Sequence, residues 1–355
     1  MKIASIVGVR PQFIKASVVS KQLRKKHDEI LIHTGQHYDY KMNNVFFNEL
    51  NIPEPEYFLG IGSGSHGYQT GEMLKKIEEV LIKEEPELVL TYGDTNSTLA
   101  GALAAAKLHI KNAHVESGLR SFDRSMPEEI NRVLTDHCSD FLFCPTENAV
   151  NNLRLEGITN NVYLTGDVMA DSLLYNKEIA ETKSTVLSDL NLKSKSYIVA
   201  TIHRASNTDN RENLKNIVDA FSQLNETIVF PVHPRTQKLL KEYGFYEILN
   251  SSVKLIEPLG FLDFIKLMNH SKMILTDSGG IQKEAYILKI PCITLRENSE
   301  WGETIEDGWN ILVGTDKDKI FQAVNDFHPS LKLHKNRFGN GDAAEKIATI
   351  IGGLQ

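Results

Sequence analysis

The sequence is poor in cysteine, and this excludes several kinds of site. Its 355 residues include only three cysteines, Cys138, Cys144 and Cys292, and no pair of them has CxxC spacing. An odd number without that spacing argues against a disulfide framework and against a zinc site. We therefore expect reduced thiols in a cytoplasmic protein, with no bound metal and no cofactor.

Long apolar runs and a surplus of basic residues are also missing. No hydrophobic stretch approaches the roughly 18 residues that a membrane span needs, and the first residues do not resemble a signal peptide. The net charge is -7 with both signs interspersed, so there is no basic field for a nucleic-acid backbone. We expect neither a membrane span nor nucleic acid as a partner, and any polyanionic ligand must be bound by local groups.

The sequence does contain a repeated alternation of short apolar runs and helix-length segments. The first six runs cover residues 3–7, 30–33, 88–91, 113–115, 141–144 and 162–164. The second six cover residues 197–202, 228–232, 253–256, 273–276, 292–295 and 311–313. Such continuous runs are typical of parallel strands that helices cover on both faces. They predict an α/β protein of two doubly wound, Rossmann-like domains. We place these at residues 1–170 and 171–355, with a terminal helix near 341–351 that can pack back on the first domain.

Acidic residues follow two of the expected strands in the first half. Asp94 and Glu116 come just after runs that should lie side by side, and Glu128 follows Pro127 at an expected helix start. Residues past the carboxyl ends of parallel strands line the ligand crevice. Asp94 alone is typical of a helix N-cap, but three acids at one sheet edge repel each other, which folds seldom keep without a use. We predict that these acids serve a ligand site, and that one of the adjacent acids Glu128 and Glu129 caps the helix while the other faces the crevice.

Two further segments of the first half are candidates for ligand binding. Arg10 precedes Pro11 where a helix should begin, and a helix N-terminus beside an arginine suits a phosphate group. An exposed loop arginine with a capping proline fits equally well, and Lys15 is ambiguous in the same way. The dinucleotide fingerprint GxGxxG is absent from this turn. 

The second strand of this half ends in another polar loop. It carries His33, Gln36, His37 and Asp39, which suit either a ligand-facing loop or local capping. A glycine-rich stretch starts at Gly60, and flexible stretches of this kind are more often linkers than lids.

The second half has two strand ends with neighbouring histidine and arginine. His203 and Arg204 follow one strand, and His233 and Arg235 repeat the arrangement. A lone histidine is usually structural, whereas two strand-end histidines with arginines beside them indicate an anion pocket.

The most specific segment of the second half is TDSGGIQKEA. Ser278, Gly279 and Gly280 follow a strand and open a helix, so backbone N–H groups can approach phosphate oxygens closely. Glu284 lies about one turn further on, where a carboxylate can accept hydrogen bonds from two vicinal ribose hydroxyls. This arrangement favours a nucleotide diphosphate site over a plain capping loop.

Taken together, these segments resemble the non-hydrolysing UDP-N-acetylglucosamine 2-epimerase family. The motifs run over nearly the full length as GVRPQFIK, TGQH, YGDTNSTLAG, HVESGLRS, MPEEINR, HPRT and TDSGGIQKEA. The resemblance implies an isomerase of polysaccharide precursor synthesis, with two domains that face a cleft as in GT-B glycosyltransferases, and commonly a homodimer. It implies a catalytic group of Asp94, Glu116, Glu128 and His203. It implies UDP binding by Arg10, Lys15, His203, Arg204, Ser278, Gly279, Gly280 and Glu284.

The implied reaction interconverts UDP-N-acetylglucosamine and UDP-N-acetylmannosamine through elimination of UDP to a 2-acetamidoglycal and its re-addition. Segments such as FIKASVVS and MPEEINRVLTDH look closer to members that act on UDP-2,3-diacetamido-2,3-dideoxyglucuronate, so the same epimerisation of that sugar is an alternative. A GT-B glycosyltransferase is an alternative of another class. It would need an acceptor and one base rather than acids on both faces of a sugar ring.

Overall fold

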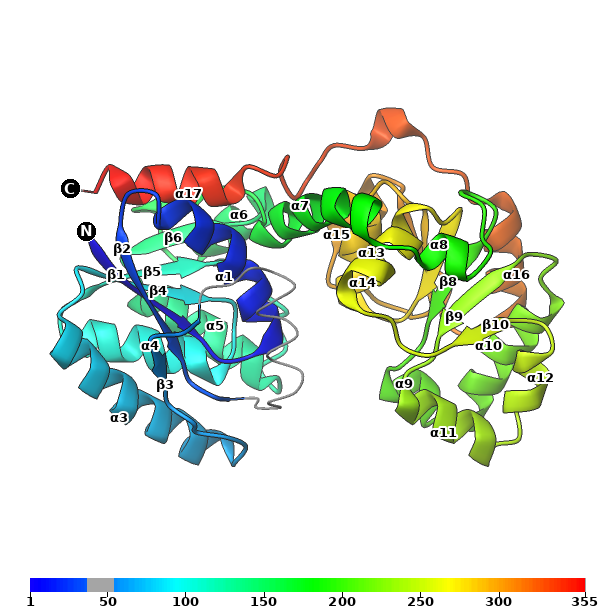
Figure 1. Cartoon of the computed structure of the whole chain (residues 1–355), viewed down its shortest axis with the longest axis horizontal. Helices are drawn as coiled ribbons and strands as arrows, with labels where there is room; N and C mark the ends of the chain where they lie inside the picture. The colour runs from blue at the N-terminus through cyan, green and yellow to red at the C-terminus, as the bar shows by residue number, and fades with distance from the viewer. Residues whose placement is uncertain (37–53, 355) are drawn as a thin grey trace. The chain divides into compact units, whose positions relative to one another are not determined.

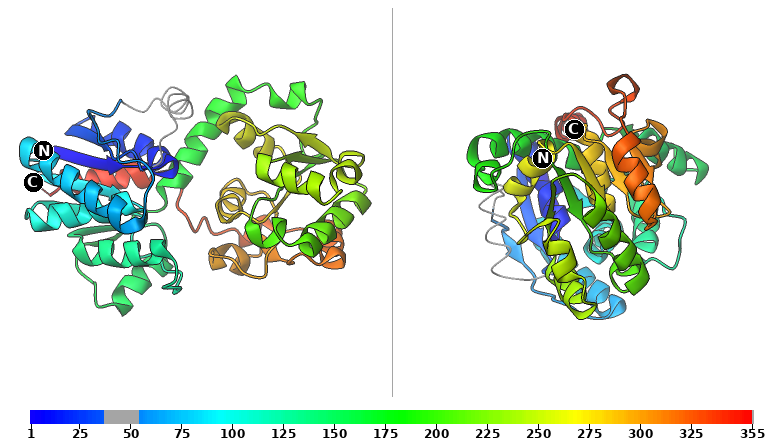
Figure 2. Two further views of the ribbon diagram at one scale, coloured as in Figure 1. Left: turned by 90° about the horizontal axis from the view of Figure 1, so that it is seen from below. Right: turned by 90° about the vertical axis from the view of Figure 1, so that its right-hand side faces the viewer.

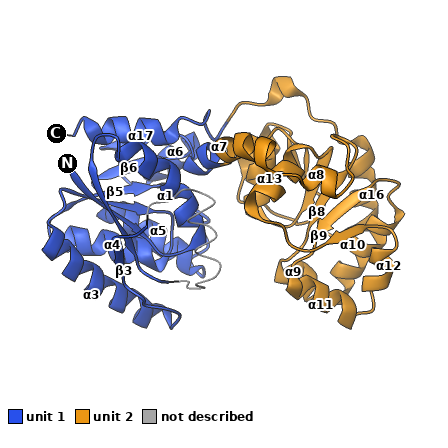
Figure 3. Ribbon diagram, in the orientation of Figure 1, with its two compact units in different colours: residues 1–172, 337–355 blue, residues 173–336 orange. Residues whose placement is uncertain are grey.

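The computed structural model describes residues 1–36 and 54–354. The chain forms two compact units, which Figure 3 colours separately. Unit 1 holds Met1–Ser172 and Arg337–Gln355, and unit 2 holds Leu173–Asn336. The chain thus returns to unit 1 at Arg337, whereas the sequence placed everything after residue 170 in a second domain whose terminal helix could pack back.

Unit 1 is built on a parallel sheet of seven strands in the order β3-β2-β1-β4-β5-β6-β7. The strands are β1 (Lys2–Val7), β2 (Asp28–His33), β3 (Tyr57–Phe58), β4 (Leu88–Tyr92), β5 (Lys111–Val115), β6 (Phe141–Cys144) and β7 (Val162–Leu164). Six of them were predicted, and β3 was missed because two residues are too few for a readable pattern. The strand order reverses between β1 and β4, which is the switch point where open α/β sheets bind ligands.

Helices cover both sides of this sheet (Figures 1 and 2). They are α1 (Arg10–Leu23), α3 (His66–Glu84), α4 (Asn96–Lys107), α5 (Pro127–Cys138), α6 (Glu147–Leu155), the start of α7 (Val168–Lys183) and α17 (Ala343–Gly352). Helix α3 is amphipathic, with Met73, Ile77 and Leu81 buried one turn apart against the sheet. Helix α4 is rich in alanine, and these small side chains let it pack close to the strands. Its first turn follows β4 at the switch point.

The C-terminal helix α17 completes unit 1. It lies beside α1 (Figure 1), and the carboxylate of Asp171 accepts hydrogen bonds from the N–H groups of Ala343 (3.1 Å) and Ala344 (2.7 Å) at its first turn. Burial raises the pKa of Asp171 above its usual value, against the effect of these two bonds. This cap, 172 residues away along the chain, anchors the returning segment.

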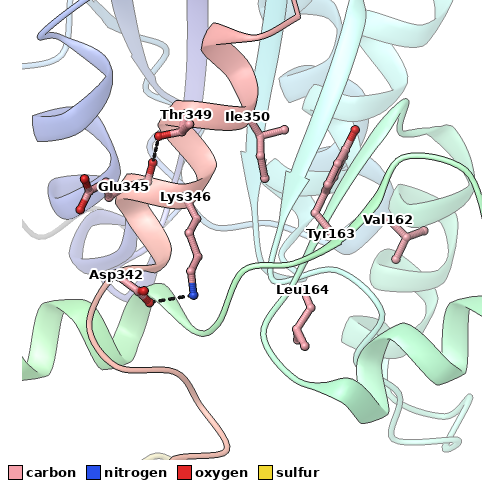
Figure 4. A pocket seen from close by; sticks show the side chains of 8 residues that line it. All are labelled: Val162, Tyr163, Leu164, Asp342, Glu345, Lys346, Thr349 and Ile350. Atoms are coloured by element: carbon pink, nitrogen blue, oxygen red, sulfur yellow. Dashed lines mark hydrogen bonds and ion pairs between the residues drawn. The ribbon is translucent and has the colours of Figure 1, made fainter.

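A groove of about 690 Å³ lies between α17 and the edge strand β7 (Figure 4). Its lining residues are Val162, Tyr163, Leu164, Asp342, Glu345, Lys346, Thr349 and Ile350. The polar contacts drawn there stay within α17, where Lys346 pairs with Asp342 at 3.0 Å. None of the site residues predicted from the sequence lines this groove.

Unit 2 repeats the same topology with six parallel strands in the order β10-β9-β8-β11-β12-β13. The strands are β8 (Ile198–Thr201), β9 (Ile228–Pro231), β10 (Lys254–Ile256), β11 (Met273–Thr276), β12 (Cys292–Thr294) and β13 (Asn310–Leu312). All six overlap predicted runs. Successive residues of β8 enter different cores, with Ile198 and Ala200 on one face and Val199 on the other. Both faces of the sheet are therefore buried, as the continuous apolar runs indicated.

The helices of unit 2 connect these strands. They are α8 (Val186–Asp189), α9 (Ala205–Thr208), α10 (Arg211–Gln223), α11 (Pro234–Glu242), α12 (Tyr246–Asn250), α13 (Phe261–Asn269), α14 (Gly279–Ile287), α15 (Gly302–Glu306) and α16 (Lys317–Asp326), with a 3₁₀ turn at Leu331–Leu333. In the described part of the chain, no helix is long and apolar enough to cross a membrane.

Candidate active site

Two predicted acids follow neighbouring strands at the switch-point edge of unit 1. Strands β4 and β5 pair with Tyr92 opposite Val115, so the turns after both strands are adjacent. The N–H of Gly93 donates to the carbonyl of Val115 at 3.0 Å. Asp94 follows Gly93, and Glu116 follows Val115, so the sheet brings these two acids together as expected.

The turn after β5 holds its acid in an unusual backbone conformation. Glu116 has φ +73°, in the left-handed region that costs an ordinary residue about 1–2 kcal/mol. Gly93 also has a positive φ, and a Cβ added there would lie 3.1 Å from Lys15 Nζ and 3.3 Å from Glu116 Oε2. The glycine therefore leaves room for an acid and a lysine beside the end of β4.

Lys15 belongs to this acid group in the structure. It lies one turn into α1, and its ammonium forms an ion pair with the Glu116 carboxylate, both side chains being only about one-tenth exposed. The sequence suggested Lys15 as a UDP ligand. In this structure its partner is an acid 101 residues away along the chain. Arg10 is the first residue of α1 and is exposed, one position further into the helix than we expected.

Asp94 is not the N-cap of the helix that follows it. Thr95 takes that place, because its side chain accepts the N–H of Thr98. The Asp94 carboxylate is therefore left to the guanidinium of Arg132, with Oδ2 and Nη2 2.5 Å apart. Arg132 also contacts Glu129 at 2.9 Å. Sequence reasoning assigned Arg132 no role, although it stands one turn after the two glutamates of MPEEINR.

The two adjacent glutamates of α5 have different environments. Glu129 is buried, and its carboxylate accepts the N–H groups of Ser121 (2.8 Å) and Phe122 (3.0 Å). Burial alone would raise its pKa, but these bonds and Arg132 hold the pKa of Glu129 below its usual value. The expected helix cap is thus wrong in detail, since Glu129 anchors a preceding loop. Glu128 is exposed.

Asp94 and Glu128 share a cavity of about 520 Å³ in unit 1. It is lined by Val9, Pro11, Gln36, Ser63, Gly64, His66, Gln69, Asp94, Thr95, Asn96, Pro127, Glu128 and Asn131. Gln36 and part of the glycine-rich stretch thus face a cavity, as a ligand loop would. His33 does not: it is buried, its Nδ1 accepts the N–H of Gly35, and burial lowers its pKa to about 4. His37 and Asp39 lie outside the described residues.

Unit 2 has a buried acid at the position where unit 1 has Asp94, which lines a cavity. Asp277 follows β11 and is fully buried. Its carboxylate accepts the N–H groups of His203 (3.1 Å) and Arg204 (3.0 Å), and the side-chain amide of Asn207 at 3.2 Å. It therefore fixes the turn after β8 and leaves the His203 imidazole 45% exposed. Sequence reasoning did not single out Asp277, although it stands inside the TDSGG motif.

The TDSGG segment forms the start of a helix, as predicted. Ser278 is the N-cap of α14, and Gly279 and Gly280 are its first residues. The first N–H groups of a helix have no acceptor within it and carry partial positive charge. Glu284 lies on the same helix, half-buried.

Arg204 lies close to this helix start through a shared acid. The Glu300 carboxylate is 3.4 Å from Arg204 and 2.9 Å from Arg296. The same carboxylate lies 2.9 Å from where a Cβ on Gly279 would stand. A negatively charged side chain therefore already occupies the neighbourhood of the predicted phosphate site.

The second predicted histidine–arginine pair serves local structure instead. His233 is the N-cap of α11, and its Nδ1 accepts the N–H of Arg235 at 3.2 Å. The Arg235 guanidinium pairs with Asp209 at 2.6 Å. Both side chains thus have partners within unit 2.

Comparison with known proteins places this chain in a family. The family model described as UDP-N-acetylglucosamine 2-epimerase matches residues 21–352. A Methanococcus maripaludis protein named UDP-N-acetylglucosamine 2-epimerase homolog is 59% identical over 100% of both chains. The chain belongs to the UDP-N-acetylglucosamine 2-epimerase family. This confirms the resemblance carried by the sequence motifs, and the members of this family are isomerases.

Two further relatives of this epimerase family extend the comparison. The UDP-2,3-diacetamido-2,3-dideoxy-D-glucuronate 2-epimerase of Pseudomonas aeruginosa is 46% identical over 100% of both chains. The crystal structure of the Methanocaldococcus jannaschii UDP-GlcNAc 2-epimerase in complex with UDP-GlcNAc and UDP has a TM-score of 0.85 and 51% identity, covering 99% of this chain and 100% of that one. The predicted fold class, two parallel α/β sheets of the GT-B type, is confirmed.

Proposed function

We propose that this protein interconverts UDP-N-acetylglucosamine and UDP-N-acetylmannosamine by epimerisation at C2. The observation that carries the proposal is the acid group of unit 1. There Asp94 is paired with Arg132 and shares a cavity with Glu128, and Glu116 on the adjacent turn is paired with Lys15. A GT-B transferase needs one base, whereas inversion at C2 needs proton transfer on both faces of the ring.

The first step that this chemistry requires is cleavage of the C1–O bond. A sugar C2–H is too weak an acid to be removed directly, so UDP departs first and positive charge develops on the ring. The helix start at Ser278 and Gly279, with His203 and Arg204, suits the departing diphosphate, because N–H dipoles and cations stabilise developing negative charge. Glu284 suits the ribose hydroxyls. The carboxylates of unit 1 stabilise the cationic ring.

The second step transfers the C2 proton. One carboxylate removes it as the C1–C2 double bond forms, which gives UDP and a neutral 2-acetamidoglycal. A proton is then delivered to the opposite face of C2, and UDP adds back to C1. Asp94 and Glu116 are held by different cations, Arg132 and Lys15, so the two carboxylates sit in different electrostatic surroundings. Such a pair can serve as base and acid in turn.

The second candidate substrate is UDP-2,3-diacetamido-2,3-dideoxyglucuronate. The name of the Pseudomonas aeruginosa relative supports it. The residues of segments such as FIKASVVS and MPEEINRVLTDH support it as well. The same acids would act, because the reaction at C1 and C2 does not change.

Incubation of the protein with each nucleotide sugar in deuterated water decides among these functions. Proton NMR should show deuterium at C2 and the appearance of the C2 epimer, faster for the true substrate. An Asp94→Asn variant, which keeps the fold and the predicted UDP ligands, is the matched control and should exchange far more slowly. No C2 deuterium in either sugar would refute the proposal. Sugar transfer to an added acceptor without epimer formation would favour a GT-B glycosyltransferase.

Assembly and location are part of the same proposal. The family resemblance favours a homodimer, which light scattering of the purified protein would detect as twice the mass of one chain. A cytoplasmic location is supported by three cysteines without a disulfide, and cell fractionation would test it.

A further inference from the structure

A fully buried histidine lies directly behind the acid group of unit 1. His114 is on β5, two residues before Glu116, and its ring is completely inaccessible to solvent. Its Nδ1 is 2.7 Å from Oδ1 of Asp136, and its Nε2 is 2.7 Å from the carbonyl oxygen of Gly93. Neither the catalytic set nor the UDP site predicted from the sequence includes His114 or Asp136.

The partner carboxylate can only accept hydrogen bonds. Asp136 lies on α5, and its Oδ2 accepts from Nη1 of Arg120 (2.7 Å) and from the N–H of Gly118 (3.1 Å). Burial alone would raise its pKa, but the bond from His114 and the charge of Arg120 hold the pKa of Asp136 below its usual value. Arg120 in turn pairs with Glu156 at 2.6 Å, so its guanidinium contacts two carboxylates.

These contacts define the charge state of the ring. An ionised carboxylate and a backbone carbonyl are both acceptors, so each of the two nitrogens of His114 must donate a proton. Only the imidazolium form has two N–H groups. A neutral ring would leave one buried acceptor without its donor, which costs about 1–3 kcal/mol.

The same two side chains hold both turns that carry the acids. His114 bonds the carbonyl of Gly93, the residue before Asp94. Asp136 bonds the N–H of Gly118, two residues after Glu116. Gly118 has φ +78°, and a Cβ there would lie 2.3 Å from the carbonyl oxygen of Ala149, so only glycine fits at this turn.

We propose that His114 is a positioning residue for the epimerisation, held as a buried imidazolium between Asp136 and the Gly93 carbonyl, and that it sets the placement of Asp94 and Glu116. The inference rests on the function proposed above. The physical reason is that the two N–H groups of the His114 ring connect the turn after β4 with the turn after β5. One reaches the carbonyl of Gly93, and the other reaches Asp136, which accepts the N–H of Gly118. A displacement of about 1 Å between reacting groups can cost 100-fold in rate.

The charge state is tested on the wild-type protein without substrate. ¹⁵N NMR of the histidine rings at neutral pH should show both nitrogens of His114 protonated. His33 is an internal reference in the same spectrum, because its Nδ1 accepts the N–H of Gly35 and its ring is neutral. A neutral His114 ring would overturn the proposal. This measurement also decides the matter if a His114 variant fails to fold.

The positioning role is tested with His114→Gln, which keeps one amide donor and loses the charge. We expect kcat to fall about 100-fold, while KM and the Kd for UDP stay within about threefold of wild type because the predicted UDP ligands are untouched. The matched control is His270→Gln, which removes a histidine 3.0 Å from Glu181 in unit 2 and should keep the wild-type kcat. A folded His114→Gln enzyme with unchanged kcat would overturn the proposal. Wild-type protein that shows no epimerisation would contradict the proposed function instead, and the NMR result would stand apart from it.

Discussion

Units 1 and 2 have the same strand order around the switch point, but the residues at their strand ends differ in kind. In unit 1 the turns after β4 and β5 carry carboxylates, each beside a cation. In unit 2 the turn after β8 carries His203 and Arg204, and the turn after β11 opens a helix with Gly279 and Gly280. One topology thus positions the groups that we propose for proton transfer in one unit and the groups that we propose for anion binding in the other. The fold determines where these side chains stand, and their residue types determine which chemistry they can perform.

The contrast is sharpest for two aspartates that follow corresponding strands. Asp94, after β4, lines a cavity and pairs with an arginine. Asp277, after β11, is fully buried and accepts backbone N–H groups. A carboxylate whose lone pairs are taken by backbone donors organises a turn, whereas one with an accessible oxygen can act on a ligand. We therefore expect substitutions in unit 1 to change turnover and substitutions in unit 2 to change binding.

The largest expected effect comes from neutralising the acids of unit 1. Asp94→Asn and Glu116→Gln should each lower kcat about 10³-fold, because each removes a group that transfers a proton or stabilises charge. The Kd for UDP, measured by calorimetry, should stay close to wild type. A wild-type rate in either variant would remove that residue from the mechanism. It would also contradict the assignment of turnover to unit 1 and of binding to unit 2.

A second test separates structure from chemistry within unit 1. Glu129→Gln should lower the free energy of unfolding by about 2 kcal/mol at neutral pH, because Glu129 accepts buried hydrogen bonds. The pKa of Glu129 is lowered in the folded protein, so its stabilisation is full above the ordinary glutamate pKa and is lost as the pH falls through the lowered value. Urea denaturation curves of variant and wild type should therefore converge in acid.

The neighbouring residue is the control for this test. Glu128→Gln should leave the unfolding free energy unchanged, because Glu128 is exposed, and should reduce turnover. Equal stability losses in both variants would contradict the different roles assigned to the two glutamates.

A smaller effect is expected in unit 2. Glu284→Gln weakens the proposed contact with the ribose, which should raise KM about tenfold while kcat changes little, the sign of an interaction made equally in the ground and transition states. Steady-state rates over a range of substrate concentrations measure both constants. A loss confined to kcat would show that Glu284 takes part in the chemical step.

The smallest effect concerns the core thiols, one in each unit. Burial raises the pKa of Cys144 and of Cys292 to about 12. The reactive thiolate is therefore scarce at neutral pH and remains so in mild alkali. Iodoacetamide should leave both thiols unmodified in the native protein and alkylate both in urea, as mass spectrometry would show. Native labelling of one of them would reveal that its unit opens more readily.

Several features of the site could not be predicted because they depend on contacts between distant parts of the chain. The ion pair of Lys15 with Glu116 spans 101 residues, and the contact of Arg132 with Asp94 spans 38. Local patterns also could not decide the N-cap of α4, since Asp94 and Thr95 are both good N-cap residues and only the backbone geometry selects Thr95. Strand β3 was missed because its two residues are a strand only through pairing with β2.

The sequence by itself determined the two parallel sheets, the strand ends at which acids and the glycine turn stand, and the family. Apolar runs and helix-length spacers suffice for this, because they report burial and local geometry within a few residues. Only the tertiary structure decided which acid is held by which cation, that Glu129 anchors a loop rather than capping its helix, that Asp277 is structural, and that His114 stands between the two acid-bearing turns. The reason is that the role of a carboxylate depends on the residues that the sheet brings next to it. It also depends on whether its oxygens already accept hydrogen bonds from the protein or are still available to a ligand.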